Sequence, residues 1–120
     1  VRVIAIESNP QLVTRAKIIF EQLQLSDNLI HHRALKDGYE EKAPYDVIIF
    51  NGAIREIPHH ILAQLADKGR IIAIRFDRSP VLGLKTVLGQ CVLVSRAGQE
   101  LHTKVLFDAH AVPIEELLYN

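Results

Sequence analysis

The chain has 120 residues, enough for one domain with a hydrophobic core, and 48% of them are hydrophobic while only 6% are aromatic. Lys plus Arg and Asp plus Glu each number 14, so the chain lacks the net charge that marks nucleic-acid-binding domains. Cys91 is the single cysteine, which excludes a disulfide framework, and no apolar run approaches the ~18–20 residues of a membrane span. We expect one cytoplasmic domain, 1–120, without a nucleic-acid or membrane partner.

A short strand followed by an acid opens the chain. Residues 3–6 are apolar, Glu7 follows them, and residues 9–24 have helical spacing with Asn9 as N-cap and Pro10 at the first helical position. In open α/β sheets, ligands bind at the carboxyl ends of the strands, where an acidic side chain commonly accepts hydrogen bonds from ribose hydroxyls. Glu7 is therefore a candidate ligand of a nucleotide-type cofactor. The alternative is a carboxylate that only complements the dipole of the following helix.

Strands and helices continue to alternate up to Phe76. They are expected at residues 29–33 (strand), 46–50 (buried strand), 58–68 (helix, closed by Gly69) and 70–76 (strand), with a polar loop over 36–45. The strand at 46–50 is expected to stop at a turn formed by Asn51, Gly52 and Ala53.

The pattern changes after Phe76. Residues 77–89 have no clear periodicity and are expected to form a loop with at most one helical turn. Residues 90–97 and 100–107 then indicate two strands joined by a Gly-containing hairpin. The chain is thus predicted to have an α/β fold whose sheet is mostly parallel and ends in an antiparallel hairpin.

Four short motifs in this order resemble one family: EKAPYD at 41–46, EIP at 56–58, QL at 64–65 and GR at 69–70. The chain is similar to the carboxyl-terminal part of protein L-isoaspartyl O-methyltransferases, which are class I S-adenosylmethionine-dependent enzymes. The resemblance implies a Rossmann-like methyltransferase sheet and covers nearly all of the chain. The hairpin and residues 107–113 resemble a divergent bacterial branch of this family.

The resemblance also implies a set of cofactor-binding positions. Glu7 matches the acid that binds the ribose hydroxyls, and Asn51, Gly52 and Ala53 match the loop that lines the site where methyl donor and acceptor meet. The implied cofactor-binding residues are Ile6, Glu7, Ser8, Ala34, Asn51 and Gly52.

Two departures from the family are visible. The family's first strand and its Gly-rich loop precede Val1 and have no counterpart, and the absence of any Met agrees with a part of a longer protein. The family usually has Gly-Asp-Gly after the third strand, whereas Ala34 stands at the position of that Asp. Asp37 is the nearest acid and could substitute only if the loop shifts.

The implied reaction is methyl transfer from S-adenosylmethionine to the isoaspartyl carboxylate of a damaged protein or peptide, a protein-repair step. A carboxylate is ionised at neutral pH, so no catalytic general base is expected. The rival hypothesis is a non-catalytic binding or structural remnant of the fold, which Ala34 favours. A dehydrogenase-type dinucleotide domain is weaker because it leaves residues 43–46 and 56–58 unexplained.

Other reactive side chains have simpler interpretations. His31 and His32 would point to opposite faces of a strand, so no metal site is expected. Ser8 and Ser79 lack a recognisable triad, Cys91 is expected to be a buried small hydrophobe, and Glu40–Glu41 belong to a solvated loop.

The implied first strand would lie between the strands at 3–6 and 47–50. Without it, the 120-residue chain is expected to be inactive, marginally stable and prone to self-association, because unpaired strand edges recruit other strands.

Overall fold

The computed structural model describes residues 2–26, 29–78 and 82–118. Its first unit consists of β1 (Ala5–Glu7), α1 (Pro10–Gln22) and β2 (Ile30–His32), with β1 and β2 paired in parallel. The Asn9 side-chain oxygen accepts hydrogen bonds from the backbone N–H groups of Gln11 (2.9 Å) and Leu12 (3.4 Å). The predicted cap and strand–helix–strand order are therefore confirmed.

The second unit is a four-stranded sheet in the order β3-β4-β5-β6. Its strands are β3 (Tyr45–Ile54), β4 (Leu65–Arg75), β5 (Val87–Ala97) and β6 (Glu100–Ala111). The β3–β4 pair is parallel, and the β4–β5 and β5–β6 pairs are antiparallel. The hairpin is confirmed and is longer than predicted at its open end, so Gly89 belongs to β5 and not to a loop.

The helix expected at 58–68 is wrong in its second half. Helix α2 spans only His59–Ala63, and Leu65 already belongs to β4. Leu65 pairs with Tyr45, and the Gln64 carbonyl accepts a hydrogen bond from the Tyr45 N–H (2.7 Å). The spacing of the apolar residues suits a helix, but pairing with β3 draws Leu65 into the sheet; Lys68, with φ of 64°, is then outside the helical region.

The polar loop at 36–45 contains two single turns of 3₁₀-helix, η2 (Leu35–Asp37) and η3 (Glu40–Lys42). A further turn, η4 (Glu115–Leu117), follows β6. Of the predicted loop at 77–89, residues 79–81 lie outside the described residues.

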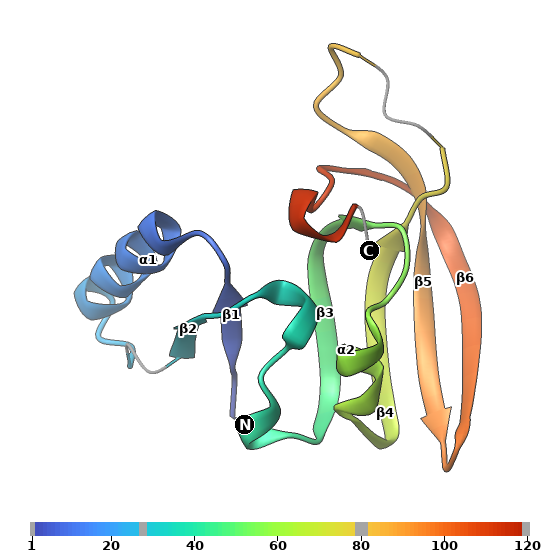
Figure 1. Cartoon of the computed structure of the whole chain (residues 1–120), viewed down its shortest axis with the longest axis horizontal. Helices are drawn as coiled ribbons and strands as arrows, with labels where there is room; N and C mark the ends of the chain where they lie inside the picture. The colour runs from blue at the N-terminus through green and yellow to red at the C-terminus, as the bar shows by residue number, and fades with distance from the viewer. Residues whose placement is uncertain (1, 27–28, 79–81, 119–120) are drawn as a thin grey trace.

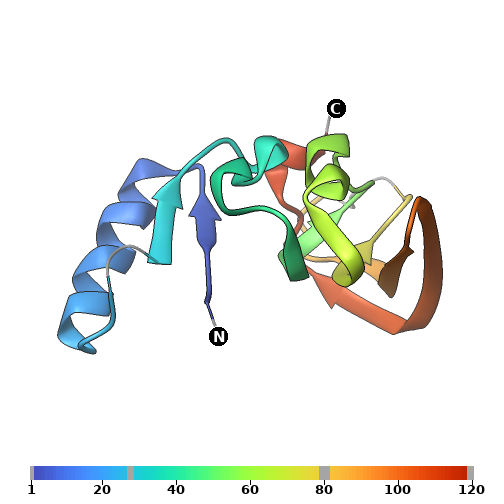
Figure 2. The same ribbon diagram turned by 90° about the horizontal axis from the view of Figure 1, so that it is seen from below.

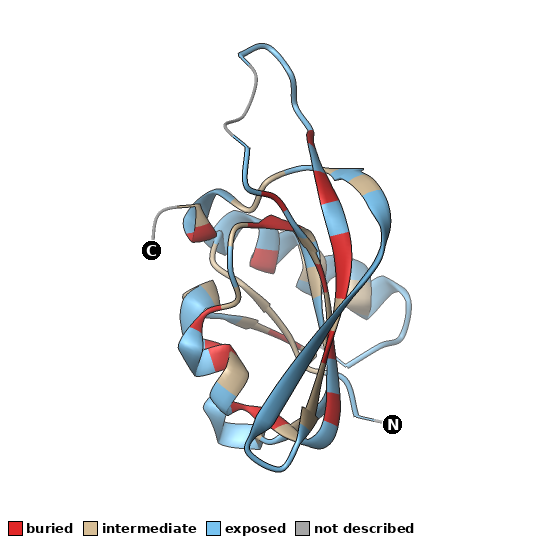
Figure 3. Cartoon of the chain, turned by 90° about the vertical axis from the view of Figure 1, so that its right-hand side faces the viewer, coloured by how far each residue is buried: buried red, intermediate tan, exposed pale blue. Residues whose placement is uncertain are grey.

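One face of the four-stranded sheet carries the main hydrophobic core. The core is built from β3, β4 and β5 together with α2 and η4, and its members are Ile54, Ile61, Leu65, Ile71, Ala73, Val92, Val94 and Leu117. Figure 3 shows this burial along alternate positions of the strands. Val47 and Ile49 of β3 are 48% and 70% exposed, so the alternate positions of β3 leave apolar side chains uncovered.

The two units stand side by side with β1 nearer than β2 to β3 (Figures 1 and 2). β1 and β3 belong to separate sheets and are not paired, so the two strands do not close directly on each other. The Cα radius of gyration is 15.1 Å, above the about 13.6 Å typical of a compact chain of this length. This arrangement leaves β1 and β3 without a strand partner on the edges where the two sheets end.

No helix in the described part of the chain is long and apolar enough to cross a membrane. Within the same residues, no three His, Cys, Asp or Glu side chains are grouped as a metal site would require.

Candidate functional site

Glu7 lies at the carboxyl end of β1, where the sequence places it. Its Oε2 accepts hydrogen bonds from the Asn9 N–H (3.0 Å) and the Ser8 hydroxyl (3.5 Å). Its Oε1 has no hydrogen-bond partner among the described residues, and the residue is half-buried. One oxygen therefore fixes the start of α1, and the other remains available to a ligand.

The carboxyl end of β2 lies directly beside Glu7. Glu7 and His32 are paired in register, and the Arg33 N–H donates to the Glu7 carbonyl (3.1 Å). The His32 Nε2 is 2.9 Å from the Ser8 carbonyl oxygen. Sequence reasoning missed His32 as a neighbour of the site, because only the β1–β2 register reveals it. The ring of His31 instead packs on Tyr39, with centroids 4.3 Å apart.

Ala34 follows β2 and begins η2, and its carbonyl accepts a hydrogen bond from the Asp37 N–H (3.1 Å). The Asp37 carboxylate is exposed and has no partner among the described side chains. The tight turn therefore leaves Asp37 free three residues beyond Ala34. Whether it replaces the missing acid stays a prediction.

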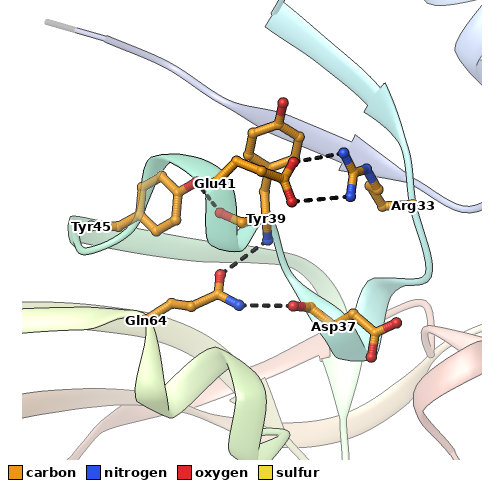
Figure 4. Close-up of polar contacts among 6 residues, drawn as sticks. All are labelled: Arg33, Asp37, Tyr39, Glu41, Tyr45 and Gln64. Carbon is orange, nitrogen blue, oxygen red and sulfur yellow. Dashed lines mark hydrogen bonds and ion pairs between the residues drawn. The ribbon is translucent and has the colours of Figure 1, made fainter.

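A buried glutamine holds this loop onto the four-stranded sheet (Figure 4). Gln64 is 6% exposed; its Oε1 accepts from the Tyr39 N–H (3.0 Å) and its Nε2 donates to the Asp37 carbonyl (2.8 Å). The Cβ of any residue replacing Gly38 would lie 2.5 Å from the Gln64 Oε1, so the loop and the amide are in close contact. Gln64 thereby anchors the loop that follows β2 to the four-stranded sheet.

An ion pair and a tyrosine hydroxyl group make further contacts in the same loop. The Arg33 guanidinium donates two hydrogen bonds to the Glu41 carboxylate, at 3.2 and 2.6 Å, and lies 4.7 Å from the centroid of the Tyr39 ring. The Tyr45 hydroxyl donates to the Tyr39 carbonyl. Burial raises the pKa of Tyr45, and the nearby Tyr39 and Glu41 raise it further. Glu41 is exposed, as expected for this loop, and is paired with Arg33.

The turn expected at Asn51–Ala53 is wrong, because these residues continue β3. Ile49 pairs with Ile72 and Ala53 with Ile74, so β3 advances four residues while β4 advances two, and Asn51 and Gly52 lie in this bulge. Ala53 is fully buried, and Asn51 is exposed.

Pairing with the carboxyl-terminal segment extends the strand. The Ala53 N–H donates to the Val112 carbonyl (2.8 Å), and the Ala53 carbonyl accepts from the Ile114 N–H (2.9 Å). At Gly52 an added Cβ would lie 2.6 Å from the Ile114 Cγ1, so glycine permits this close approach. Gly52 is therefore covered from one side by the carboxyl-terminal segment.

The structure thus brings some predicted residues together and separates others. Ile6 and Glu7 lie opposite His31 and His32 in the β1–β2 pairing, with Ser8 after Glu7 and Ala34 two residues after His32. Asn51 and Gly52 lie on the other sheet. A cavity of about 490 Å³ lies at the carboxyl ends of β3 and β4 and is lined by Arg55, Arg75 and Arg78 among others. Sequence reasoning did not identify these arginines.

Comparisons with known proteins agree with the fold and the motifs. The sequence profile of the protein-L-isoaspartate(D-aspartate) O-methyltransferase family matches residues 1–87. Protein-L-isoaspartate O-methyltransferases of Aliivibrio fischeri and Methanospirillum hungatei are each 30% identical to the chain, over 110 and 112 residues, which cover 92% and 93% of the chain. These stretches are 49% and 48% of the two relatives, so the chain spans about half the length of the curated relatives it matches.

Solved structures support the same fold. A protein-L-isoaspartate O-methyltransferase superposes with a TM-score of 0.79 at 20% identity, covering 97% of this chain and 35% of that protein. A putative protein-L-isoaspartate O-methyltransferase from Plasmodium falciparum, in complex with S-adenosyl-L-homocysteine, has a TM-score of 0.70 at 19% identity and covers 95% of this chain and 52% of that protein. On the profile match and the shared fold, this chain belongs to the protein-L-isoaspartate(D-aspartate) O-methyltransferase family.

Proposed function

We propose that the complete protein transfers a methyl group from S-adenosylmethionine to an isoaspartyl carboxylate of a damaged protein or peptide in the cytoplasm. The observation that carries this proposal is Glu7, whose Oε1 is free to accept a hydrogen bond at the carboxyl end of a parallel strand in a member of this family. An acid at this place suits ribose hydroxyls. The free oxygen of Glu7 therefore supports an adenosyl cofactor.

The chain's own residues would bind S-adenosylmethionine and orient it toward the acceptor carboxylate. Glu7 would accept ribose hydrogen bonds, with Ile6 and Ser8 beside it, and Ala34 would border the adenine side. When bound, S-adenosylmethionine supplies an activated methyl group. The acceptor carboxylate is already ionised at neutral pH, so the protein needs to align the reactants and exclude water but needs no general base.

The second candidate is a non-catalytic relative that keeps the fold. The observation that favours it is Ala34, which has no carboxylate with which to contact an adenine amino group. Asp37 lies one 3₁₀ turn away, and its carboxylate has no partner among the described residues. In the catalytic case, Asp37 would restore this contact.

Calorimetric titration of the complete protein with S-adenosylhomocysteine separates the two candidates when it is combined with a methyl-transfer assay on an isoaspartyl peptide. The Glu7→Ala variant should bind S-adenosylhomocysteine about 1.5–3 kcal/mol more weakly, roughly 10- to 150-fold in Kd, because a hydrogen bond to a charged group is lost. Glu21→Ala, which removes an exposed acid of α1, is the matched control.

Unchanged affinity in Glu7→Ala would remove Glu7 from the site. Cofactor binding without methyl transfer would favour the non-catalytic relative. The 120-residue chain alone should transfer no methyl group at a useful rate, and robust transfer by it would contradict the expected contribution of a central strand.

A further inference from the structure

The cavity at the carboxyl ends of β3 and β4 is rich in arginine. Arg55 follows β3, Arg75 ends β4, and Arg78 lies three residues beyond it; the cavity of about 490 Å³ is lined by all three. Asp77 and Asp108 also line it, so its charged side chains leave one net positive charge. Parallel pairing of β3 and β4 places the two arginine-bearing ends on the same edge of the sheet.

The three guanidinium groups make no ion pair in the described part of the chain, although Asp77 and Asp108 line the same cavity. The two carboxylates offset two of the three positive charges, and a bound anion would offset the third. The cavity is therefore suited to an external anion.

Arg55 is partly preorganised for such a ligand. Its guanidinium lies 4.7 Å from the centroid of the Phe76 ring, and its Nη2 donates to the Arg78 carbonyl (3.5 Å). Phe76 is 3% exposed and forms a buried apolar support. A guanidinium fixed over an aromatic ring keeps its remaining N–H groups for bidentate contact with a carboxylate.

We propose that this arginine cavity binds an acidic side chain of the acceptor peptide next to the residue that is methylated. This inference rests on the proposed function and adds a preference for acidic acceptor segments to it. The ligand is a second carboxylate and not the one that is methylated, because a carboxylate paired with guanidinium is a weaker nucleophile. Arg55 lines the cavity and lies two residues beyond Ala53, the last of the three residues that the family resemblance places beside the acceptor.

Fluorescence anisotropy tests this proposal with the complete protein at low salt. The probes are a labelled isoaspartyl peptide with two flanking glutamates and the same peptide with two glutamines. The glutamate peptide should bind roughly three- to tenfold more tightly, and the preference should fall as salt rises. Arg75→Gln and Arg78→Gln should each reduce the preference. Arg70→Gln, which removes an exposed charge in the middle of β4 and outside the cavity lining, should keep it.

Equal binding of the two peptides, or an equal loss of the preference in Arg70→Gln, would overturn the proposal. An oligothymidylate that binds as tightly and with the same dependence on Arg75 and Arg78 would overturn it as well, because the cavity would then be a general polyanion site. Anisotropy requires no methyl transfer. A preference that persists in a protein without methyl transfer or S-adenosylhomocysteine binding would therefore contradict the proposed function alone.

Discussion

Replacing Gln64 with Leu should uncouple the loop at 34–45 from the four-stranded sheet. The substitution keeps an apolar body of similar size but removes the acceptor for the Tyr39 N–H and the donor to the Asp37 carbonyl, at 3.0 and 2.8 Å. Each hydrogen bond contributes about 1 kcal/mol net, and each backbone group left buried without a partner costs about 1–3 kcal/mol. Partial access of water to the half-buried loop gives an expected loss of about 2–4 kcal/mol in the free energy of unfolding.

Urea denaturation of the complete protein, followed by circular dichroism, measures this loss. The midpoint should fall while the m-value is unchanged, since the surface exposed on unfolding is the same. Gln99→Leu, at an exposed position of the β5–β6 turn, is the matched control and should change stability by less than about 0.5 kcal/mol. Hydrogen exchange at the Tyr39 amide should accelerate in Gln64→Leu. A change below about 0.5 kcal/mol, with the Tyr39 amide still protected, would refute the reasoning.

Three further outcomes are expected. The raised pKa of Tyr45 implies a contribution to the free energy of unfolding that is present below pH ~10 and is lost as pH rises through the folded-state pKa. Tyr45→Phe should therefore lose less stability at alkaline pH than the unchanged protein when denaturation is measured against pH. An identical alkaline loss in the variant would contradict this. Gly52→Ala should cost about 1–3 kcal/mol and expose residues 112–118 to proteolysis, because its Cβ would collide with Ile114 and its φ of 153° disfavours a side chain. Gly98→Ala, with φ of 62° and no atom within 4 Å of an added Cβ, shows the effect of a positive φ without a collision, and an equal effect of both would exclude the collision. The isolated 120-residue chain should self-associate through unpaired strand edges and exposed Ile49. Light scattering measures this association, and hydrogen exchange measures protection over 47–50. A strictly monomeric chain that is as protected there as the complete protein would contradict the prediction.

Local signals predicted the elements that depend on neighbouring residues. Asn9 and Pro10 fix the start of α1 through contacts with the next few residues, and the structure has the cap that this pair predicts. The prediction of a helix over 58–68 is wrong beyond Ala63, because apolar residues at helical spacing also suit a strand. Pairing of Leu65 with Tyr45, twenty positions earlier in the chain, decided between the two structures.

Distant pairing also explains the errors near the candidate site. Asn51 and Gly52 have the composition of a turn, but hydrogen bonds from Ala53 to the segment at 112–114 extend the strand through them. The arginine cavity was missed for the same reason. Arg55 and Arg75 are separated in sequence, and only the β3–β4 register shows that they line one cavity.

The order in which the chain connects its strands indicates where residues of both sheets could border one ligand site. The chain steps from β1 outward to β2, then crosses over and steps from β3 in the opposite direction to β4 (Figure 1). In open parallel sheets the ligand crevice lies outside the carboxyl ends of the strands where this direction reverses. One strand paired with both β1 and β3 would set them two interstrand spacings apart, about 9.6 Å. Glu7 and Asn51 would then border the same crevice, so a strand inserted between β1 and β3 would join the predicted residues into one site.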